Sequence, residues 1–321
     1  MHRFGFLLSP EESTLEVMVF VEALRAANKA AGRSLYVWRE LHEQDADSLW
    51  EVESVVVFGR VDAIAQRTSV AARLRSLAAR GRRIGSVGQG VFSLAAAGLL
   101  SGAKAAVPWS HMDCFRELYP DLGTVDGCFV IDRNRFSCCG QLATADLAVR
   151  LIEGDQGTNL AVEVADALCL ERIRCSEEPQ GKLRRAGYKA LHPKLATAIA
   201  VMEENLEEPV SLDWVAQAID LSPRQLQRLF RVHFQESPSA HYMRLRLKRA
   251  KSLVEGTDMQ ISEVAVACGF VSLSHFSRRY RMEFDSLPGQ GRSGGGRSLV
   301  RPVGPESTVQ QNTLNETQVF T

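Results

Sequence analysis

The chain lacks a net charge, and it lacks any apolar run long enough to cross a bilayer. Its 38 Lys and Arg residues equal its 38 Asp and Glu residues, so no excess of one sign draws the whole molecule to nucleic acid or to a membrane. A membrane-spanning helix needs about 18–20 consecutive apolar residues, and no run approaches that length. The N-terminal sequence MHRFGFLLSPEE is apolar too briefly and turns acidic too soon for a secretory signal. We therefore expect a cytoplasmic protein with no membrane partner.

The cysteines lack the pattern of a metal site or of a disulfide framework. There are seven of them, an odd number without metal-ligand spacing, and Cys138 and Cys139 are adjacent. This usage favours reduced thiols that fill small apolar spaces. We expect no metal and no cofactor.

Charge is unevenly distributed in the C-terminal third, although the total is zero. Residues 203–220 contain six acidic residues and no basic one. Residues 222–254 contain Glu236 as the single acidic residue and eight basic residues: Arg224, Arg228, Arg231, Arg244, Arg246, Lys248, Arg249 and Lys251. A local basic region of this kind is typical of nucleic-acid binding.

A pattern in this region is repeated about 50 residues further along the chain. The first copy is Val215, Ala216, Ile219, Leu221, Ser222, Leu226, Arg228, Phe230, Phe234 and Pro238. The second is Val264, Ala265, Cys268, Phe270, Ser272, Phe276, Arg278, Tyr280, Phe284 and Pro288. Each copy predicts a short helix, a tight turn and a second, amphipathic helix, which is the layout of a helix-turn-helix. Two such units at a fixed separation can place two recognition helices in successive major grooves of one duplex.

The two predicted recognition helices carry polar side chains on their outward faces. Ser222 and Pro223 predict an N-cap and a first-turn proline for the first of them. The side chains predicted to contact DNA are Arg224, Gln225, Gln227 and Arg228 in the first helix and Ser274, His275 and Arg278 in the second. Arginine can pair with guanine and glutamine with adenine, although an outward arginine suits a phosphate about as well. The alternative is a plain helical bundle with solvated arginines, and the duplication favours DNA binding.

The sequence ISEVAVACGFVSLSHFSRRYRMEFDSLP, with the preceding FRVHFQESPSAHYMRLRLKRAKSLV, closely resembles the AraC/XylS family of bacterial transcription regulators over about 100 residues. The resemblance implies two helix-turn-helix units, asymmetric DNA sites, and promoter activation through contact with RNA polymerase. Two glycines common in the turns of that family are replaced by Gln235 and Asp285. Because glycine adopts positive φ most easily, we expect both turns to be less relaxed.

The N-terminal half alternates strand-like and helix-like stretches. Short apolar runs predict strands, and longer stretches with helical spacing predict helices between them. The predicted strands are Arg3–Leu8, Val52–Phe58 and Arg83–Val87, and the predicted helices are Leu15–Ala30, Ala71–Arg80 and Val91–Leu100, the last closed by Gly102. The fold class is therefore an α/β N-terminal domain, a parallel sheet with helices on both faces, followed by an all-α C-terminal domain with two helix-turn-helix units.

Composition changes divide the chain into four regions. We expect a sensor and dimerisation domain over residues 1–174, a polar linker over 175–192, a DNA-binding domain over 193–292, and a disordered tail over 293–321, which is rich in glycine and lacks apolar periodicity.

The motifs EALRAAN (residues 22–28) and RGRRIGSVGQGVFSLAAAGLL, together with Trp109, resemble class I glutamine-amidotransferase-like domains, the intracellular-protease superfamily. The resemblance implies a sensor domain of the kind that one branch of AraC-type regulators carries. It places Gly88 where the superfamily's nucleophilic cysteine stands and Pro108 where its histidine stands, while the acidic partner is retained as Glu16. Without a thiol and an imidazole at this turn, we expect no hydrolase activity.

Open α/β sheets bind ligands at the carboxyl ends of their strands, which leaves a candidate effector site. The residues expected to line it are Glu16, Gly59, Gly88, Gln89, Pro108 and Trp109. An unpaired glutamate beside an aromatic ring suits a cationic small molecule, and the resembled relatives sense amino acids or quaternary amines. His111 is interpreted as a surface or packing residue. The alternative is a site that has decayed, so that the domain only dimerises.

These observations predict a sequence-specific transcription regulator, an activator that responds to a small amino-acid or amine metabolite, and not an enzyme. The expected partners are promoter DNA, RNA polymerase, the effector and a second copy of the chain. A constitutive DNA-binding regulator whose first domain only dimerises is the alternative.

Overall fold

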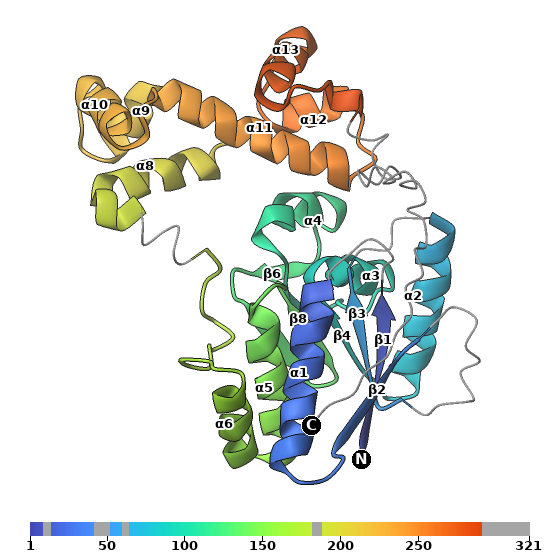
Figure 1. Ribbon diagram of the computed structural model, residues 1–321. Helices are drawn as coiled ribbons and strands as arrows, with labels where there is room; N and C mark the ends of the chain where they lie inside the picture. The colour runs from blue at the N-terminus through green and yellow to red at the C-terminus, as the bar shows by residue number, and fades with distance from the viewer. Residues whose placement is uncertain (9–13, 42–51, 60–63, 182–187, 291–321) are drawn as a thin grey trace, which may run out of the picture.

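The computed structural model describes residues 1–8, 14–41, 52–59, 64–181 and 188–290, so the predicted tail from residue 293 lies outside the described residues. The chain forms an N-terminal α/β part and a C-terminal helical part that lie against each other (Figure 1). None of the helices in the described ranges has the length and apolarity that crossing a membrane requires.

The α/β part is built on a six-stranded sheet in the order β2-β1-β3-β4-β8-β7. Its strands are β1 (His2–Leu8), β2 (Tyr36–Glu40), β3 (Ser54–Phe58), β4 (Arg83–Val87), β7 (Phe129–Asp132) and β8 (Arg135–Cys138). All neighbours run parallel except β7, which pairs antiparallel with β8. A second, two-stranded parallel sheet consists of β5 (Lys104–Ala106) and β6 (Gly123–Val125). The sheet is therefore mostly parallel, as predicted, with an antiparallel edge that the sequence pattern did not predict.

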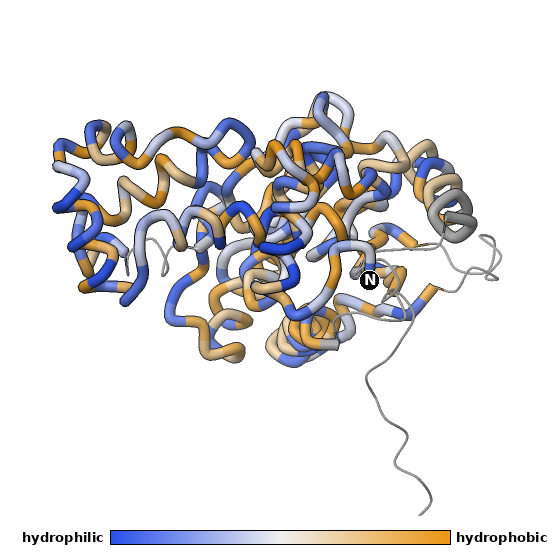
Figure 2. The backbone as a smooth tube through the Cα atoms, turned by 90° about the horizontal axis from the view of Figure 1, so that it is seen from above, coloured by the Kyte–Doolittle hydropathy of each residue, from blue (hydrophilic) through white to orange (hydrophobic). Residues whose placement is uncertain are grey.

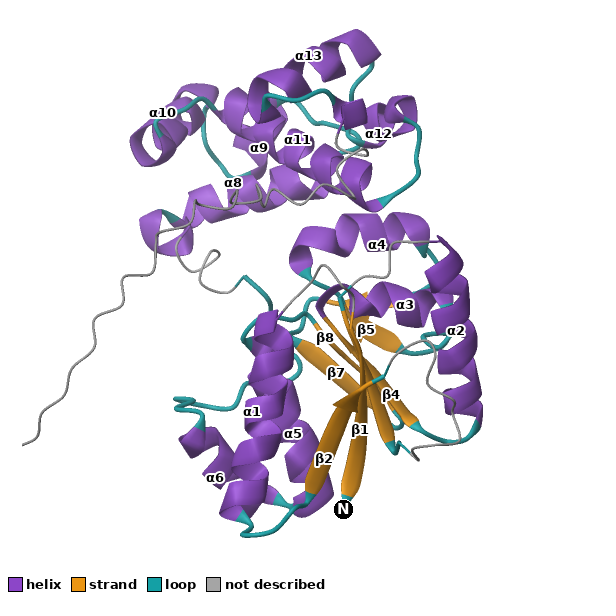
Figure 3. Ribbon diagram, turned by 45° about the vertical axis from the view of Figure 1, so that its right-hand side comes forward, coloured by secondary structure: helices purple, strands orange, loops and turns teal. Residues whose placement is uncertain are grey.

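Helices cover both faces of the large sheet (Figure 3). They are α1 (Thr14–Ala30), α2 (Ile64–Ala79), α3 (Val91–Ala96), α4 (Met112–Leu118), α5 (Ala143–Gln156) and α6 (Thr158–Ala167), with two 3₁₀ turns, η1 (Gly88–Gly90) and η2 (Trp109–His111). Side chains of β3 alternate between the faces, as the twofold period of a strand requires. Val55 and Val57 belong to the apolar core on the side of α2 and α3, whereas Val56 and Phe58 belong to the core on the side of α1, α5 and α6.

One predicted helix is shorter than expected. Helix α3 ends at Ala96 and not at Leu100, because Gly98 adopts a φ of +70°. The Gly98 and Leu99 amides donate back to the Ala95 and Leu94 carbonyls and so end the helix in a tight turn. Gly102, which was expected to close the helix, has a φ of +71° in the turn that follows.

The helical part contains α8 (Pro193–Glu204), α9 (Leu212–Ala218), α10 (Pro223–Phe234), α11 (Pro238–Gly256), α12 (Ile261–Ala267) and α13 (Leu273–Phe284). Helix α11 runs from one helix pair, α9–α10, to the other, α12–α13 (Figure 1). Hydrophobic and hydrophilic positions alternate within these helices (Figure 2), as expected for helices that each bury one face. The fold thus combines an α/β domain with a helical region that holds the repeated pattern.

Residues 175–181, at the start of the predicted linker, pack on the α/β part. The Cys128 amide donates to the Glu178 carbonyl at 3.2 Å, and the Gln180 amide donates to the Asp126 carbonyl at 2.8 Å. Gly127 and Pro179 form an isolated antiparallel bridge. This stretch is therefore part of the wall of the α/β domain.

Candidate functional site

Helices α10 and α13 are capped as the repeated pattern predicts. Ser222 Oγ accepts a hydrogen bond from the Gln225 amide at 3.3 Å, and Ser272 Oγ accepts one from the His275 amide at the same distance. Both helices end in a left-handed residue, Gln235 with a φ of 57° and Asp285 with a φ of 52°. The two turns that lack the family's glycine therefore do adopt the backbone conformation that glycine favours.

Helices α10 and α13, the predicted recognition helices, bury one face and leave the other open. In α10, Leu226 and Phe230 are buried, and in α13, Phe276 and Tyr280 are buried. Five of the seven side chains predicted to contact DNA are exposed and form no hydrogen bond or ion pair with the rest of the described chain: Arg224, Gln227, Arg228, Ser274 and Arg278. These side chains remain available for a partner.

Two predicted DNA contacts are already engaged within the protein. Gln225 is exposed, but its Oε1 accepts hydrogen bonds from the Ser222 amide at 2.8 Å and from Ser222 Oγ at 3.0 Å. A glutamine that reads adenine uses its carbonyl and its amide together, and in this conformation the carbonyl of Gln225 is engaged in a capping box; its contact with DNA stays a prediction. His275 is half-buried and accepts from Arg279 Nε at 3.4 Å.

Some residues of the basic region join helices and are not free. Arg246 donates to the Cys268 and Gly269 carbonyls at 2.8 and 2.6 Å, and its guanidinium lies 4.2 Å from the centroid of the Phe270 ring. Arg249 pairs with Glu207 at 3.7 Å. Arg246 therefore fixes the turn between α12 and α13 against α11, a role that charge counting alone did not reveal.

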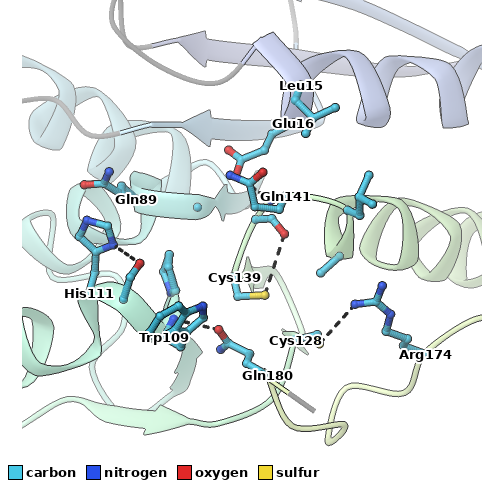
Figure 4. A pocket seen from close by; sticks show the side chains of 17 residues that line it. Leu15, Glu16, Gln89, Trp109, His111, Cys128, Cys139, Gln141, Arg174 and Gln180 are labelled. Atoms are coloured by element: carbon cyan, nitrogen blue, oxygen red, sulfur yellow. Dashed lines mark hydrogen bonds between the residues drawn. The ribbon is translucent and has the colours of Figure 1, made fainter. Parts of the chain in front are cut away.

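The α/β part contains a cavity of about 700 Å³ at the carboxyl ends of β4 and β8 (Figure 4). It is lined by Leu15, Glu16, Gly88, Gln89, Pro108, Trp109, Ser110, His111, Cys128, Cys139, Gly140, Gln141, Leu142, Ala143, Arg174, Gln180 and Gly181. Five of the six predicted lining residues are among them, whereas Gly59 does not line this cavity. His111, interpreted as a surface or packing residue, lines the cavity. Its ring also packs against that of Phe92, with 6.4 Å between the two ring centroids.

Glu16 is the buried charge of this cavity, with 4% of its surface exposed. Its Oε1 accepts the Gln141 amide at 2.8 Å, so Glu16 has one hydrogen-bond partner that the sequence did not predict. No cationic side chain of the described residues pairs with it. A Cβ at Gly88, which has a φ of +61°, would lie 2.9 Å from both carboxylate oxygens, and one at Gly140 would lie 2.1 Å from Oε1. The absence of a side chain at Gly88 and Gly140 thus provides the space that the Glu16 carboxylate occupies.

Gln180 joins the predicted linker to the cavity wall. It is buried, and its Oε1 accepts the Trp109 amide at 2.9 Å. Its Nε2 donates to the Val107 and Gly127 carbonyls at 2.8 and 2.9 Å. Trp109 is 59% exposed and lines the cavity, to which it adds an aromatic surface. No local sequence pattern indicates a role for Gln180, because its three partners are 53 to 73 residues away.

The two thiols in the cavity are held in their protonated form. A hydrogen bond with Cys139 and burial raise the pKa of Cys128 far above its usual value. For Cys139, the hydrogen bond with Cys128 lowers the pKa, but a hydrogen bond with Cys138 and burial outweigh it and raise the pKa overall. Because the thiolate is the nucleophilic form, neither thiol replaces the cysteine that is missing at Gly88.

Comparison with known proteins identifies the class of this molecule. A family model described as a helix-turn-helix domain matches residues 215–294, which run from within α9 to beyond the end of α13. The chain is 37% identical to the HTH-type transcriptional regulator GbdR of Pseudomonas aeruginosa, over 93% of this chain and 86% of that protein. It is 34% identical to the HTH-type transcriptional regulator ArgR of the same species, over 91% of this chain and 93% of that protein. The protein is thus a DNA-binding transcription regulator and not an enzyme.

Among solved structures, the chain is similar to a transcriptional regulator with an AraC-type DNA-binding domain from Chromobacterium violaceum, at 42% identity. That match covers 33% of this chain and 94% of the other, with a TM-score of 0.32. The similarity to the full-length regulators, and not this partial structural match, shows that the chain belongs to the AraC family of transcription regulators.

Proposed function

We propose that the protein is a cytoplasmic transcription activator that binds promoter DNA through two helix-turn-helix units and responds to a small amino-acid or amine metabolite. The observation that carries the effector assignment is the buried carboxylate of Glu16 in a cavity of about 700 Å³, without a cationic partner among the described residues. A buried charge is costly unless it is paired, so a cationic ligand would find a site that is already favourable to it.

On the DNA side, the two pairs α9–α10 and α12–α13 would act as the two helix-turn-helix units. Arg224, Gln227 and Arg228 are the proposed contacts of the first recognition helix. Ser274 and Arg278, with the half-buried His275 beside them, are those of the second. Because the two sets differ, the site on DNA would be asymmetric.

On the effector side, the chemistry of the lining favours a ligand with an ammonium group. Glu16 supplies the counter-charge, and the exposed ring of Trp109 supplies an aromatic surface that attracts cations. Arg174 lines the same cavity; its Nε pairs with the buried carboxylate of Asp146 at 3.4 Å, while 38% of its side chain is exposed. A guanidinium opposite a carboxylate would suit an amino acid better than a simple amine.

The type of domain to which we assign the α/β part supports a role as a sensor and not as a catalyst. We assign it to the glutamine-amidotransferase-like domains, because Gly88 has positive φ at a sharp turn between strand β4 and the following helix, where that superfamily places its nucleophile. With a glycine there and Pro108 in the place of the histidine, the turn would persist as part of a binding site.

Regulation requires that the effector bind two arrangements of the protein with different affinity. The activating arrangement would present both recognition helices to promoter DNA and would contact RNA polymerase, and the α/β domains of two copies would form a homodimer. By reciprocity, DNA must change effector affinity by the same factor as the effector changes DNA affinity.

The test combines genome-wide mapping of bound sites with a ligand screen on the full-length protein. Purified protein should bind one mapped site in vitro, and its melting temperature should rise with one member of a panel of amino acids and quaternary amines. Promoter output that never responds to any member, with no ligand that raises the melting temperature, would instead support a constitutive regulator whose first domain only dimerises.

A further inference from the structure

The effector cavity and the DNA-binding part of the chain share one short turn, η2. On its inner side, Trp109, Ser110 and His111 line the cavity. On its outer side, the Ser110 carbonyl accepts a hydrogen bond from Ser252 Oγ of helix α11 at 2.9 Å. This turn therefore lines the space for the ligand and, through Ser110, contacts the helix that lies between the two helix pairs.

Apolar packing extends this contact. Helix α4 follows η2 directly and packs against α11 (Figure 1). Cys114 and Phe115 of α4 and Leu253 and Val254 of α11 are fully or almost fully buried and belong to one continuous apolar cluster. That cluster also includes Phe276 of α13. The core of the second helix pair is thus continuous with the segment that follows the cavity wall.

The turn is held tightly on its other sides as well. The Trp109 amide donates to the buried Gln180, and the His111 amide donates to the Pro108 carbonyl at 2.8 Å. Gln180 belongs to the segment that leads toward α8. The turn η2 has only three residues, and hydrogen bonds hold the amides of Trp109 and His111. A backbone movement that shifts the cavity-lining side chains of this turn therefore also shifts the Ser110 carbonyl.

The contact does not block DNA directly. Helices α10 and α13 lie on the side of the helical part that faces away from the α/β part (Figures 1 and 3). Control through this contact must therefore act on the placement of α11, which sets the separation and orientation of the two recognition helices.

We infer that η2, through the hydrogen bond from Ser252 to the Ser110 carbonyl, couples occupancy of the cavity to DNA binding, while the packing of α4 on α11 holds the two groups together. The inference rests on the proposed function, because it takes the cavity as the effector site. Coupling between two sites acts in both directions, so the inference can be tested without a ligand. If it holds, binding of DNA to α10 and α13 changes the stability of η2 and α4, which are outside the proposed DNA contacts.

The experiment measures hydrogen–deuterium exchange of the full-length protein, free and bound to a duplex of its best selected binding site. A duplex of scrambled sequence serves as the DNA control. We expect the specific duplex to change the exchange rates of amides in residues 109–118 by about fivefold or more, the lower end of measured allosteric coupling. Two variants interrupt the contact: Ser252→Ala removes the donor, and Ser252→Gln inserts a longer side chain. The matched control is Ser239→Gln, at an exposed position of the same helix.

The expected result is that the DNA-dependent change persists in Ser239→Gln and is lost in both Ser252 variants. Two results would overturn the inference: no change at residues 109–118 in the unmodified protein, or a full change in Ser252→Ala. If Ser252→Gln disrupts folding, Ser252→Ala alone decides. Failure of every amino acid and amine to bind would refute the proposed effector site and would leave the exchange result standing, so the two failures are distinguishable.

Discussion

Replacement of Arg228 tests whether α10 reads bases or holds the phosphate backbone. Arg228 is exposed on α10 and forms no hydrogen bond or ion pair with the described residues. Its removal therefore costs no internal interaction, and the free energy of unfolding of Arg228→Ala should stay within about 0.5 kcal/mol of the unmodified protein. Any loss of DNA affinity then reports the contact with DNA.

The two roles of Arg228 predict different magnitudes. A bidentate contact with a guanine contributes about 1–3 kcal/mol of discrimination, which is about a 5- to 150-fold loss of affinity for the specific site. A contact with a phosphate weakens all sequences alike and changes the slope of log K against log salt by about 0.9. We expect the first pattern, with discrimination against a scrambled duplex reduced by the same factor.

The assay is a fluorescence anisotropy titration of specific and scrambled duplexes between about 50 and about 200 mM salt. Arg228→Lys is the matched variant, because lysine keeps the charge but cannot form the planar, two-pronged contact. Base reading requires Arg228→Lys to lose discrimination as well. Equal weakening of both duplexes in Arg228→Ala, with near-normal binding by Arg228→Lys, would refute it.

Three further substitutions test, in turn, the cavity, the helix pair α12–α13 and the helix pair α9–α10. Glu16→Gln keeps an acceptor for the Gln141 amide but removes the charge, so a cationic effector should bind about 10- to 150-fold more weakly in calorimetry, the equivalent of about 1.5–3 kcal/mol. In denaturant unfolding, Gly269→Ala should lower the free energy of unfolding by about 1–3 kcal/mol more than Gly102→Ala does. Both glycines have φ near +70°, so the backbone strain is the same. Only at Gly269 would the added Cβ meet another side chain, that of Pro209 at 2.5 Å. Burial lowers the pKa of His241 below its usual value despite its hydrogen bond to Glu236, so the folded state favours the neutral ring. Stability should therefore fall as the pH drops below about 6.5, where the unfolded chain takes up the proton, and His241→Gln should make the melting temperature less sensitive to acid.

Each of these expectations has an outcome that contradicts it. Unchanged affinity of Glu16→Gln for a cationic effector would remove the carboxylate from the site. Equal unfolding free energies for Gly269→Ala and Gly102→Ala would mean that Pro209 yields without cost. An acid sensitivity that survives in His241→Gln would assign it to other titratable groups.

The sequence predicted those features of the DNA-binding part that depend on near neighbours along the chain. The caps at Ser222 and Ser272 and the buried positions Leu226 and Phe276 follow from residue type and helical spacing, and all are present. The role of Gln225 in a capping box was missed for a local reason too. A glutamine three residues after an N-cap serine suits both a capping box and an adenine, and spacing alone does not choose between them.

The cavity was only partly predictable, because long-range contacts build it. Glu16 and Gly88 were located through resemblance to a known turn, but the Gln141 amide that binds Glu16 comes from 125 residues away. Gln180 was counted as part of a polar linker, since nothing in its surroundings along the chain indicates burial. Gly59 was placed in the cavity because it follows a strand of the same sheet, but the cavity lies beyond β4 and β8.

The absence of a nucleophile at Gly88 affects how such a regulator reports on its surroundings. A reactive thiol at this turn would trap or convert part of the ligand, and the signal would record past exposure. With a glycine there, and with Cys128 and Cys139 held protonated, a ligand of the proposed effector site would leave chemically unchanged. Occupancy of that site would then follow the free ligand concentration at each moment, and the proposed response would switch off by simple dissociation, without repair or resynthesis of the protein.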